Sequence, residues 1–253
     1  MIKEGKIILH NGKQYIPDLR NVNLKPPFRG RPEISMEKVD EQALIDICPL
    51  GAISINPINL DMGKCAFCGE CAFAFPQKIK FTQDYKISSN IRENLIVKEG
   101  ETNPIQFDKT AIQKDVKSTF GKSLKLRQVS AGGDNSCETE LGAAGNANFD
   151  MSRYGIEFTA SPRHADGIVV TGPITESMAG PLRIAYDAIP EPKIFALCGV
   201  DAISGGLFSE SKAINRSILK DIKVDLYIPG NPSHPLTIVN ALLNLTRKKQ
   251  VKF

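Results

Sequence analysis

The sequence predicts two folded units of different class, an α+β unit that carries most of the cysteines and an α/β unit with a parallel sheet. Four of the six cysteines lie between residues 48 and 71, whereas the second half alternates short apolar runs with helical segments. We place the cysteine-bearing unit and its N-terminal extension at residues 1–100, a polar linker at 101–125, and the α/β unit at 126–253.

The α/β prediction depends on three short apolar runs, each typical of a buried strand: DGIVVTG (166–172), KIFALCG (193–199) and VDLYIPG (224–230). Helical spacing predicts a helix over 176–189 and a terminal amphipathic helix over 233–249. Strands that alternate with helices imply a parallel sheet covered by helices.

Sites in such sheets form on loops beyond the carboxyl ends of the strands. Three segments qualify: Thr171–Glu176, Gly199–Gly206 and Pro229–His234. Ser233 is a candidate N-cap for the terminal helix, with Pro235 in its first turn. One further helix is expected within the polar linker, at 109–118.

Composition excludes several classes of protein. The formal net charge of +4 is mild and scattered, which does not indicate nucleic-acid binding, and the basic end TRKKQVKF is expected to be solvated. We expect no membrane span and no secretory signal, and therefore a cytoplasmic protein, held at the inner face of the cell membrane through partner subunits. Because P-loop, Rossmann and nucleophile-elbow motifs are missing from the sequence, we assign it no independent catalysis.

The cysteines follow half of a ferredoxin pattern. Two-cluster bacterial ferredoxins carry the run C-x2-C-x2-C-x3-C-P twice, and the fourth cysteine of each run ligates the cluster of the other. Here KCAFCGECAFAFP supplies Cys65, Cys68 and Cys71 but has Phe75 at the fourth position, while Cys48, in DICPLG, is the surviving fourth cysteine of the other run. Crossed ligation then leaves one complete set of four ligands.

We therefore predict one [4Fe–4S] cluster on four cysteines, Cys48, Cys65, Cys68 and Cys71. Phe75 is expected to fill the cavity of the lost second cluster, because an empty apolar cavity is costly. An alternative is a zinc ion, since pairs of cysteines in C-x2-C spacing also suit tetrahedral zinc.

Two resemblances cover most of the chain. Residues 28–98, with FRGRPEI, CPLGAI, LDMGKCAFCGEC and IKFTQDYKIS, resemble the ferredoxin-like subunit of formate hydrogenlyase and related energy-converting hydrogenases. Residues 130–245, with GGDNSCETE, SPRHADGIVVTGPIT and DLYIPGNPSHP, resemble the small subunit of the same complexes, which is similar to the 20 kDa subunit of complex I. The chain thus resembles a fusion of the two subunits, which implies a ferredoxin-like fold followed by a flavodoxin-like fold.

That family holds a further [4Fe–4S] cluster on four cysteines of its small subunit. The resemblance maps these positions to Asp134, Cys137, Asp201 and Asn231, so one cysteine of the four remains. Because three hard oxygen ligands do not normally retain a cubane, we expect this proximal cluster to be lost. Two alternatives remain open: Asp134, Cys137, Asp201 and His234 bind a different metal, or these polar residues hydrogen-bond one another in the former cavity.

Three further residues of the second half are assigned structural or docking roles. Cys198 is expected to be a neutral buried thiol on its strand. Arg163 and His164 match the family's loop near the cluster, where they would serve subunit docking.

The resemblance implies two functions from different classes. In the first, the chain is an electron-transfer subunit of a hydrogenase-related, complex I-like membrane-associated oxidoreductase with one cluster. In the second it is a structural or docking subunit, and the cluster is a folding staple. In both, the expected partners are a large hydrogenase-like (complex I 49 kDa-like) subunit and membrane-arm subunits. A soluble one-cluster ferredoxin would leave the second half without a role.

Overall fold

The computed structural model describes residues 2–12, 14–112 and 114–246. Its second half is built on a five-stranded parallel sheet with the strand order β10-β9-β8-β6-β7, which confirms the expected parallel sheet. The strands are β6 (Leu124–Ser130), β7 (Ile156–Phe158), β8 (Gly167–Thr171), β9 (Ile194–Cys198) and β10 (Leu226–Ile228). The three predicted runs are β8, β9 and β10, whereas β6 and β7 are not among the predicted strands.

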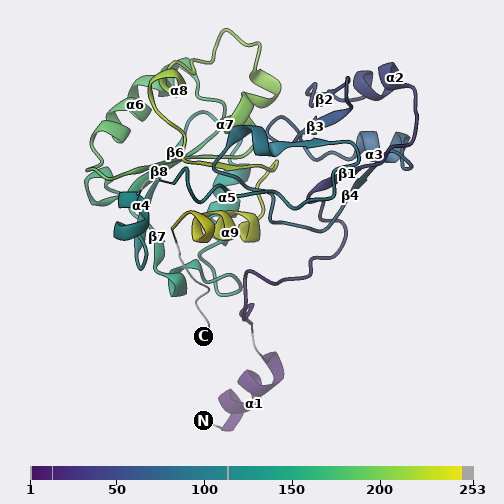
Figure 1. The fold of residues 1–253 in the computed structure, drawn as a ribbon. Coiled ribbons are helices and arrows are strands. Elements are labelled where there is room, and N and C mark those ends of the chain that lie inside the picture. The colour runs from purple at the N-terminus through teal and green to yellow at the C-terminus, as the bar shows by residue number, and fades with distance from the viewer. Residues whose placement is uncertain (1, 13, 113, 247–253) are drawn as a thin grey trace.

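Helices cover both faces of this sheet, as Figure 1 shows. They are α4 (Lys114–Thr119), α5 (Ser136–Ala143), α6 (Glu176–Asp187), α7 (Val200–Ser204), α8 (Ile218–Asp221) and α9 (Pro235–Thr246), with 3-10 turns η2 (Met151–Tyr154), η3 (Pro162–His164) and η4 (Gly206–Phe208). Helix α6 confirms the prediction over 176–189. The expected helix at 109–118 lies instead at α4, and the basic end after Thr246 lies outside the described residues.

The start of α9 differs from the prediction that Ser233 caps it. Helix α9 begins at Pro235, so His234 and not Ser233 directly precedes it, and the Ser233 hydroxyl donates instead to the carbonyl of Ile228 at 2.9 Å. His234 takes this role, because its Nδ1 accepts the Leu236 N–H at 3.1 Å and its carbonyl accepts the Ile238 N–H at 3.0 Å. The ring of His234 is held between Phe28 and Phe149, with centroids 5.1 and 5.8 Å away.

Successive residues of β8 enter two different cores, because side chains of a strand point alternately to its two faces. Ile168 and Val170 pack with α6 and α8 on one face, and Val169 packs with α9 on the other. Nearly every residue of α9 is buried, so the helix lies between the sheet and other parts of the chain. The central strands are thus covered on both sides, as their unbroken apolar sequence requires.

The cysteine-bearing half consists of short elements. A two-stranded antiparallel sheet pairs β1 (Pro32–Ile34) with β4 (Ile79–Phe81). A three-stranded antiparallel sheet has the order β2-β3-β5, from Ile53–Ser54, Asn59–Asp61 and Ile96–Lys98. The helices are α1 (Ile2–Asn11), which projects from the body in Figure 1, α2 (Glu41–Asp46), α3 (Glu70–Ala74) and the 3-10 turn η1 (Arg92–Leu95).

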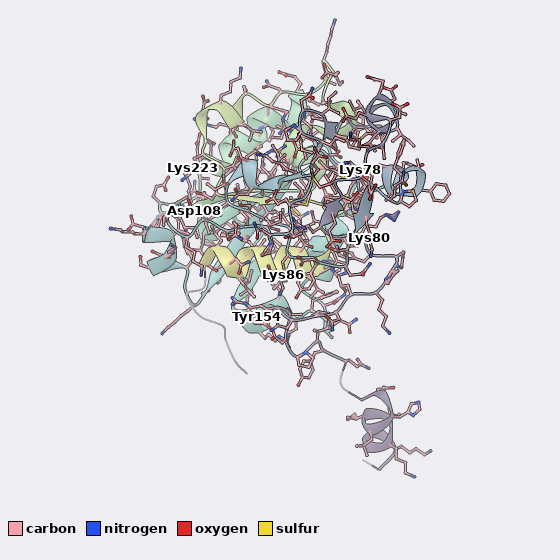
Figure 2. The ribbon with its side chains drawn as sticks, turned by 45° about the vertical axis from the view of Figure 1, so that its right-hand side comes forward. Lys78, Lys80, Lys86, Asp108, Tyr154 and Lys223 are labelled. Carbon is pink, nitrogen blue, oxygen red and sulfur yellow. The ribbon has the colours of Figure 1, made fainter. Side chains whose placement is uncertain are left out.

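A buried lysine ties these short elements together. Lys78, labelled in Figure 2, donates to the carbonyls of Ser35 and Glu37 at 2.7 and 2.8 Å and to Oε2 of Glu99 at 2.9 Å. Its side chain is only 1% exposed, and three acceptors replace the water that the ammonium loses. The lysine thus joins the segment after β1 to the segment after β5.

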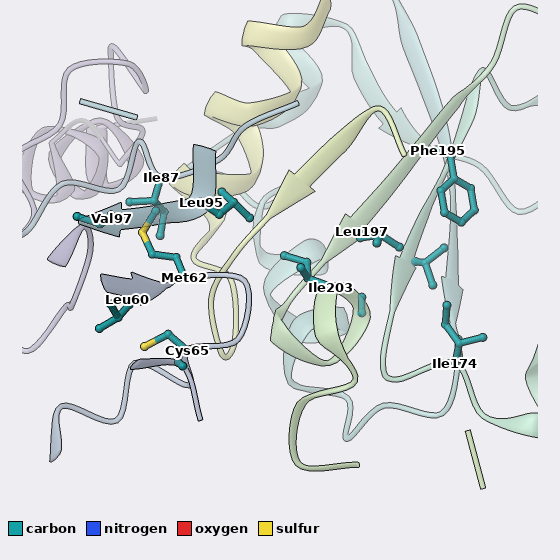
Figure 3. Close-up of a cluster of buried hydrophobic side chains, with 14 of the residues drawn as sticks. Leu60, Met62, Cys65, Ile87, Leu95, Val97, Ile174, Phe195, Leu197 and Ile203 are labelled. Atoms are coloured by element: carbon teal, nitrogen blue, oxygen red, sulfur yellow. The ribbon is translucent and has the colours of Figure 1, made fainter. Parts of the chain in front are cut away.

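The two halves share one hydrophobic core. Leu60, Met62 and Cys65 belong to the same buried cluster as Leu197 and Ile203, and Figure 3 shows this cluster extending from one half into the other. The backbones of Ser89 and Tyr227 exchange two hydrogen bonds, 3.2 and 2.9 Å long, so that the cysteine-bearing half covers the outer edge of β10. None of the helices in the described ranges is long and apolar enough to span a lipid bilayer.

Candidate metal centre

The fold brings the four predicted cysteine ligands to one pocket. Cys48 follows α2, Cys65 and Cys68 lie on the turn after β3, and Cys71 is the second residue of α3. All four line the same small pocket, together with apolar residues that include Ile53, Leu60 and Phe81. The pocket thus joins Cys48 to a segment that lies well beyond it in the chain, as crossed ligation requires.

The four thiols differ in their exposure to solvent. Cys65 and Cys71 are buried, Cys48 is half-buried and Cys68 is exposed. Burial, together with the neighbouring Cys71, Cys48 and Cys68, raises the pKa of Cys65 to about 12, although the hydrogen bond from the Phe67 N–H opposes this rise. Burial also raises the pKa of Cys71 to about 11. Both buried thiols are therefore protonated at neutral pH when no cation is present, so metal binding must release their protons.

Backbone N–H groups point at two of the sulfurs. The Ala52 N–H donates to Sγ of Cys48 and the Phe67 N–H donates to Sγ of Cys65, each at 3.2 Å. The turn that carries the Phe67 N–H has a left-handed backbone at Phe67, with φ +54°, and at Gly69, with φ +87°. A positive φ is unusual for phenylalanine, so the surrounding structure must hold this turn in place.

The donor set has the chemistry that an iron–sulfur cluster requires. Among the residues that the structure describes, no three or more His, Cys, Asp or Glu side chains are arranged around a point that could hold one metal ion. Each thiolate of a cubane binds a different iron, so its four sulfurs surround the cluster and need not converge. Four soft thiols in an apolar pocket, two of them with N–H donors, could hold such a group.

The predicted loops at the carboxyl ends of the strands also come together, with one difference. Gly199–Gly206 contains the short helix α7, so this segment is not an open loop. Gly133, after β6, lies so close to Gly172, after β8, that a Cβ on Gly133 would be 3.1 Å from the Gly172 Cα. A Cβ on Gly199 would lie 2.4 Å from Sγ of Cys137. Glycine permits these close approaches, and they bring the segments after β6, β8 and β9 together at one edge of the sheet.

Cys137 has a buried sulfur partner. Its thiol accepts a hydrogen bond from the thiol of Cys198, which lowers the pKa of Cys137, and the Ser233 N–H lowers it further. Cys198 is fully buried on β9, as predicted, and its donation to Cys137 together with burial raises its pKa well above the ordinary value. The remaining cysteine of the mapped site is therefore paired with Cys198.

The two mapped aspartates lie near each other. Burial raises the pKa of Asp201, and the charges of Asp134 and Glu138 raise it further, while Arg216 opposes this effect. Asp134 accepts two hydrogen bonds from Ser136, through its backbone N–H at 2.9 Å and its hydroxyl at 2.6 Å, which lower the pKa of Asp134. Arg216 donates to carbonyls of the α7 segment, among them Ala202 at 2.7 Å.

Asn231, the fourth mapped position, lines a separate pocket between the two halves. Phe67 of the cysteine-bearing turn lines the same pocket, as do Arg29 and His234. Arg163 and His164 lie on the surface turn η3. The structure thus brings Asp134, Cys137 and Asp201 together at one edge, whereas Asn231 faces the turn that carries Cys65 and Cys68.

Three polar residues of these sites were missed by sequence reasoning: Arg29, Glu138 and Arg216. Glu138 accepts the Thr171 hydroxyl at 2.6 Å, and a Cβ on Gly133 would lie 3.2 Å from the same Oε1 atom. The only feature of the sequence that could have drawn attention to Glu138 is its position directly after Cys137. Arg29 and Arg216 both donate to backbone carbonyls of segments distant in the sequence. Any residue can supply such a carbonyl, so the spacing of residue types does not predict these contacts.

Comparisons with known proteins support the family interpretation. The model of the family described as NADH ubiquinone oxidoreductase, 20 Kd subunit, matches residues 135–245. An NADH-quinone oxidoreductase subunit of Clostridium beijerinckii is 35% identical over 172 residues, which are 68% of this chain and 93% of that protein. The probable membrane-bound hydrogenase subunit mbhJ of Pyrococcus furiosus is 34% identical over 124 residues, which are 49% of this chain and 74% of that protein.

One solved structure adds a weaker likeness. A chain of the membrane-bound sulfane sulfur reductase, an archaeal respiratory membrane complex, is 28% identical, with 49% of this chain and 69% of that chain covered and a TM-score of 0.44. The family match lies on the half with the parallel sheet and does not include Cys48, Cys65, Cys68 or Cys71.

Proposed function

The chain belongs to the NADH ubiquinone oxidoreductase 20 kDa subunit family, and we propose that it is an electron-transfer subunit of a complex I-like oxidoreductase related to membrane-bound hydrogenases. In this proposal residues 1–100 are a ferredoxin-like domain, residues 101–125 a linker, and residues 126–253 the family domain with a flavodoxin-like fold. The five-stranded parallel sheet supports the last assignment.

One observation carries the proposal: Cys48, Cys65, Cys68 and Cys71 line a single apolar pocket. We propose that they hold one [4Fe–4S] cluster, which would supply one-electron transfer. The chain's own part is to provide four soft ligands, to limit the access of water through burial of Cys65 and Cys71, and to direct N–H groups at two sulfurs. Donors to a thiolate sulfur stabilise negative charge and so tune the reduction potential.

We further propose that the family's proximal cluster is lost from this chain. Three oxygen or amide side chains stand where thiolates are needed, at Asp134, Asp201 and Asn231. Hydrogen bonds within the former site support this view, since Asp134 is bonded to Ser136 and Cys137 to Cys198. Asp134 is also exposed to solvent, and polar groups that have water or partners of this kind do not need a metal.

An exposed apolar surface near Asp201 is evidence that partner subunits bind this chain. Leu207 and Phe208, directly after Gly206, are 73% and 49% exposed. We propose that a large hydrogenase-like (complex I 49 kDa-like) subunit covers them, and that membrane-arm subunits complete the assembly. The chain would then lie on the cytoplasmic side, at the inner face of the cell membrane, through these partners. Exposed large apolar side chains often mark interaction sites.

A second candidate function is a docking subunit whose cluster only staples the fold. The observation that favours it is the replacement of three mapped ligands at the edge where the family's proximal cluster is bound. Metal binding can contribute folding free energy outright, so a cluster can be retained without a redox role.

A redox titration separates the two functions. Anaerobically purified protein is titrated with dithionite and ferricyanide while its low-temperature EPR spectrum is recorded. The electron-transfer proposal predicts one signal that appears and disappears reversibly, whereas the staple predicts a cluster that is not reduced or does not survive reduction. The Cys68→Ser variant serves as the control, because a signal that belongs to this site must change when the exposed ligand changes.

A further inference from the structure

Arg29 makes a long-range contact that the proposed function has not used. It lies in the extended segment before β1, yet its side chain reaches the turn that carries Cys65 and Cys68. Nε donates to the carbonyl of Phe67 at 3.0 Å, and a terminal nitrogen donates to the carbonyl of Cys68 at 2.9 Å. One planar guanidinium therefore fixes two consecutive peptide groups.

The turn that Arg29 holds has an unusual backbone. Phe67 has φ +54° and Gly69 has φ +87°, and a Cβ on Gly69 would lie 3.0 Å from the Arg29 Nε. The arginine thus packs against the backbone of residues 67–69. Because a peptide group is planar, fixing the Phe67 carbonyl also fixes the N–H of Cys68. The Phe67 N–H, in the peptide group just before the two that Arg29 holds, donates to Sγ of Cys65, so the arginine contacts the same turn that supplies this donor.

The charge of Arg29 matters as well as its geometry. The guanidinium is cationic at any physiological pH, and it lies in a groove whose wall includes Cys68, Lys80 and the carboxylate of Glu70. A cluster held by four thiolates becomes more negative when it takes up an electron. A fixed cation beside the ligand loop therefore favours the reduced form, although solvent in this open groove weakens the effect.

We propose that Arg29 is a positioning residue that clamps the ligand turn and raises the reduction potential of the cluster. The redox part of the inference rests on the proposed function, because a reduction potential can be measured only if the chain holds the cluster. The clamp itself is a property of the polypeptide. It can be measured whether or not iron is bound, so the two parts of the proposal can be tested separately.

Three variants separate charge from geometry. Arg29→Gln removes the charge and the fork of donors, and Arg29→Lys keeps the charge but cannot donate to both carbonyls in the same way. Lys80→Gln is the matched control: Lys80, labelled in Figure 2, lines the same groove, and no hydrogen bond joins it to the 67–69 turn in the described structure.

The first measurement is amide hydrogen exchange over residues 65–71 in the purified protein. Arg29→Gln and Arg29→Lys should both accelerate exchange there by about tenfold, since the two hydrogen bonds to the carbonyls of the turn are lost or weakened. Lys80→Gln should leave exchange unchanged. Unchanged exchange in both Arg29 variants would overturn the clamp, even in protein that holds no iron.

The second measurement is the EPR-monitored midpoint potential of the iron-loaded protein. Arg29→Gln should lower it, Arg29→Lys should stay near the wild type, and Lys80→Gln should shift it less than Arg29→Gln. Equal potentials in the wild type and Arg29→Gln would overturn the electrostatic part. If wild-type protein takes up no iron under anaerobic reconstitution, the proposed function and this part both fail, while the exchange result still decides the clamp.

Discussion

Sγ of Cys137 lies where a side chain at position 199 would have to begin, because a Cβ built on Gly199 is only 2.4 Å from that sulfur. The two residues come from α5 and from the turn after β9, and the same glycine has φ +92°, where side chains are disfavoured. The contact joins Cys137 to the turn after β9, the strand that carries Cys198. It therefore links two elements of this edge of the sheet.

Replacing this glycine should be costly. Gly199→Ala should lower the free energy of unfolding by about 2 kcal/mol, from the left-handed backbone and the contact with the Cys137 sulfur together. Urea denaturation followed by circular dichroism gives the value. Gly199→Ala combined with Cys137→Ala should cost about 1 kcal/mol less than the sum of the single variants, since the sulfur is gone. Strict additivity would contradict the contact.

The contacts of the buried Lys78 with two carbonyls and with the partly exposed Glu99 should be costly to break. Lys78→Met leaves the carbonyls of Ser35 and Glu37 without their donor and leaves the Glu99 carboxylate unpaired. We expect a loss of about 3 kcal/mol in the free energy of unfolding, measured by urea denaturation. A loss below about 0.5 kcal/mol, the range of surface substitutions, would show that the lysine is not held as described.

The same pair predicts a dependence on acid. The hydrogen bond and charge of Lys78 lower the pKa of Glu99 below its ordinary value of 4.5, so the folded state holds the carboxylate more strongly than the unfolded state does. The resulting stabilisation is present above pH 4.5 and is lost as the pH falls through the lowered pKa. Thermal melts of Glu99→Gln should lose less of their midpoint over this range than those of the wild type. Parallel curves would contradict the pair.

His234 predicts a second pH dependence, closer to neutrality. Burial lowers its pKa from the ordinary 6.5, and its Nδ1 must stay unprotonated to accept the Leu236 N–H. Its contribution to stability is therefore complete above pH 6.5 and is lost as the pH falls through the lowered pKa. His234→Asn keeps a cap acceptor that does not titrate and should flatten the dependence of the melting midpoint on pH between about pH 7 and pH 5. A slope equal to that of the wild type would show that another group titrates.

Much of the sheet could be predicted from the sequence. The runs that form β8, β9 and β10 are apolar because they are covered on both faces, and such runs stand out by composition alone. Strand β6 was missed, although it pairs with both β7 and β8. Lys125 and Arg127 interrupt its apolar residues, and this charged pattern resembles the polar linker before it.

The same contrast holds for the candidate site: the grouping of its four cysteines could be predicted from the sequence, whereas contacts made only in the folded chain could not. Residue spacing groups Cys48 with Cys65, Cys68 and Cys71, because ligands must occupy fixed positions around their metal. Residue type predicts the cap of α9 at Ser233, since serine is a favoured cap, but the helix begins one residue later and His234 accepts the Leu236 N–H instead. Contacts of this kind depend on which segments meet in the folded chain.

The central claim is that the chain holds one cluster and that Cys48 belongs to it. The most direct measurement is the iron content of anaerobically reconstituted protein, compared with Cys48→Ala and with Cys137→Ala. We expect about four irons per chain in the wild type and in Cys137→Ala, and a marked loss in Cys48→Ala. About eight irons in the wild type, falling to about four in Cys137→Ala, would contradict the account, as would a wild-type protein that folds and binds no iron.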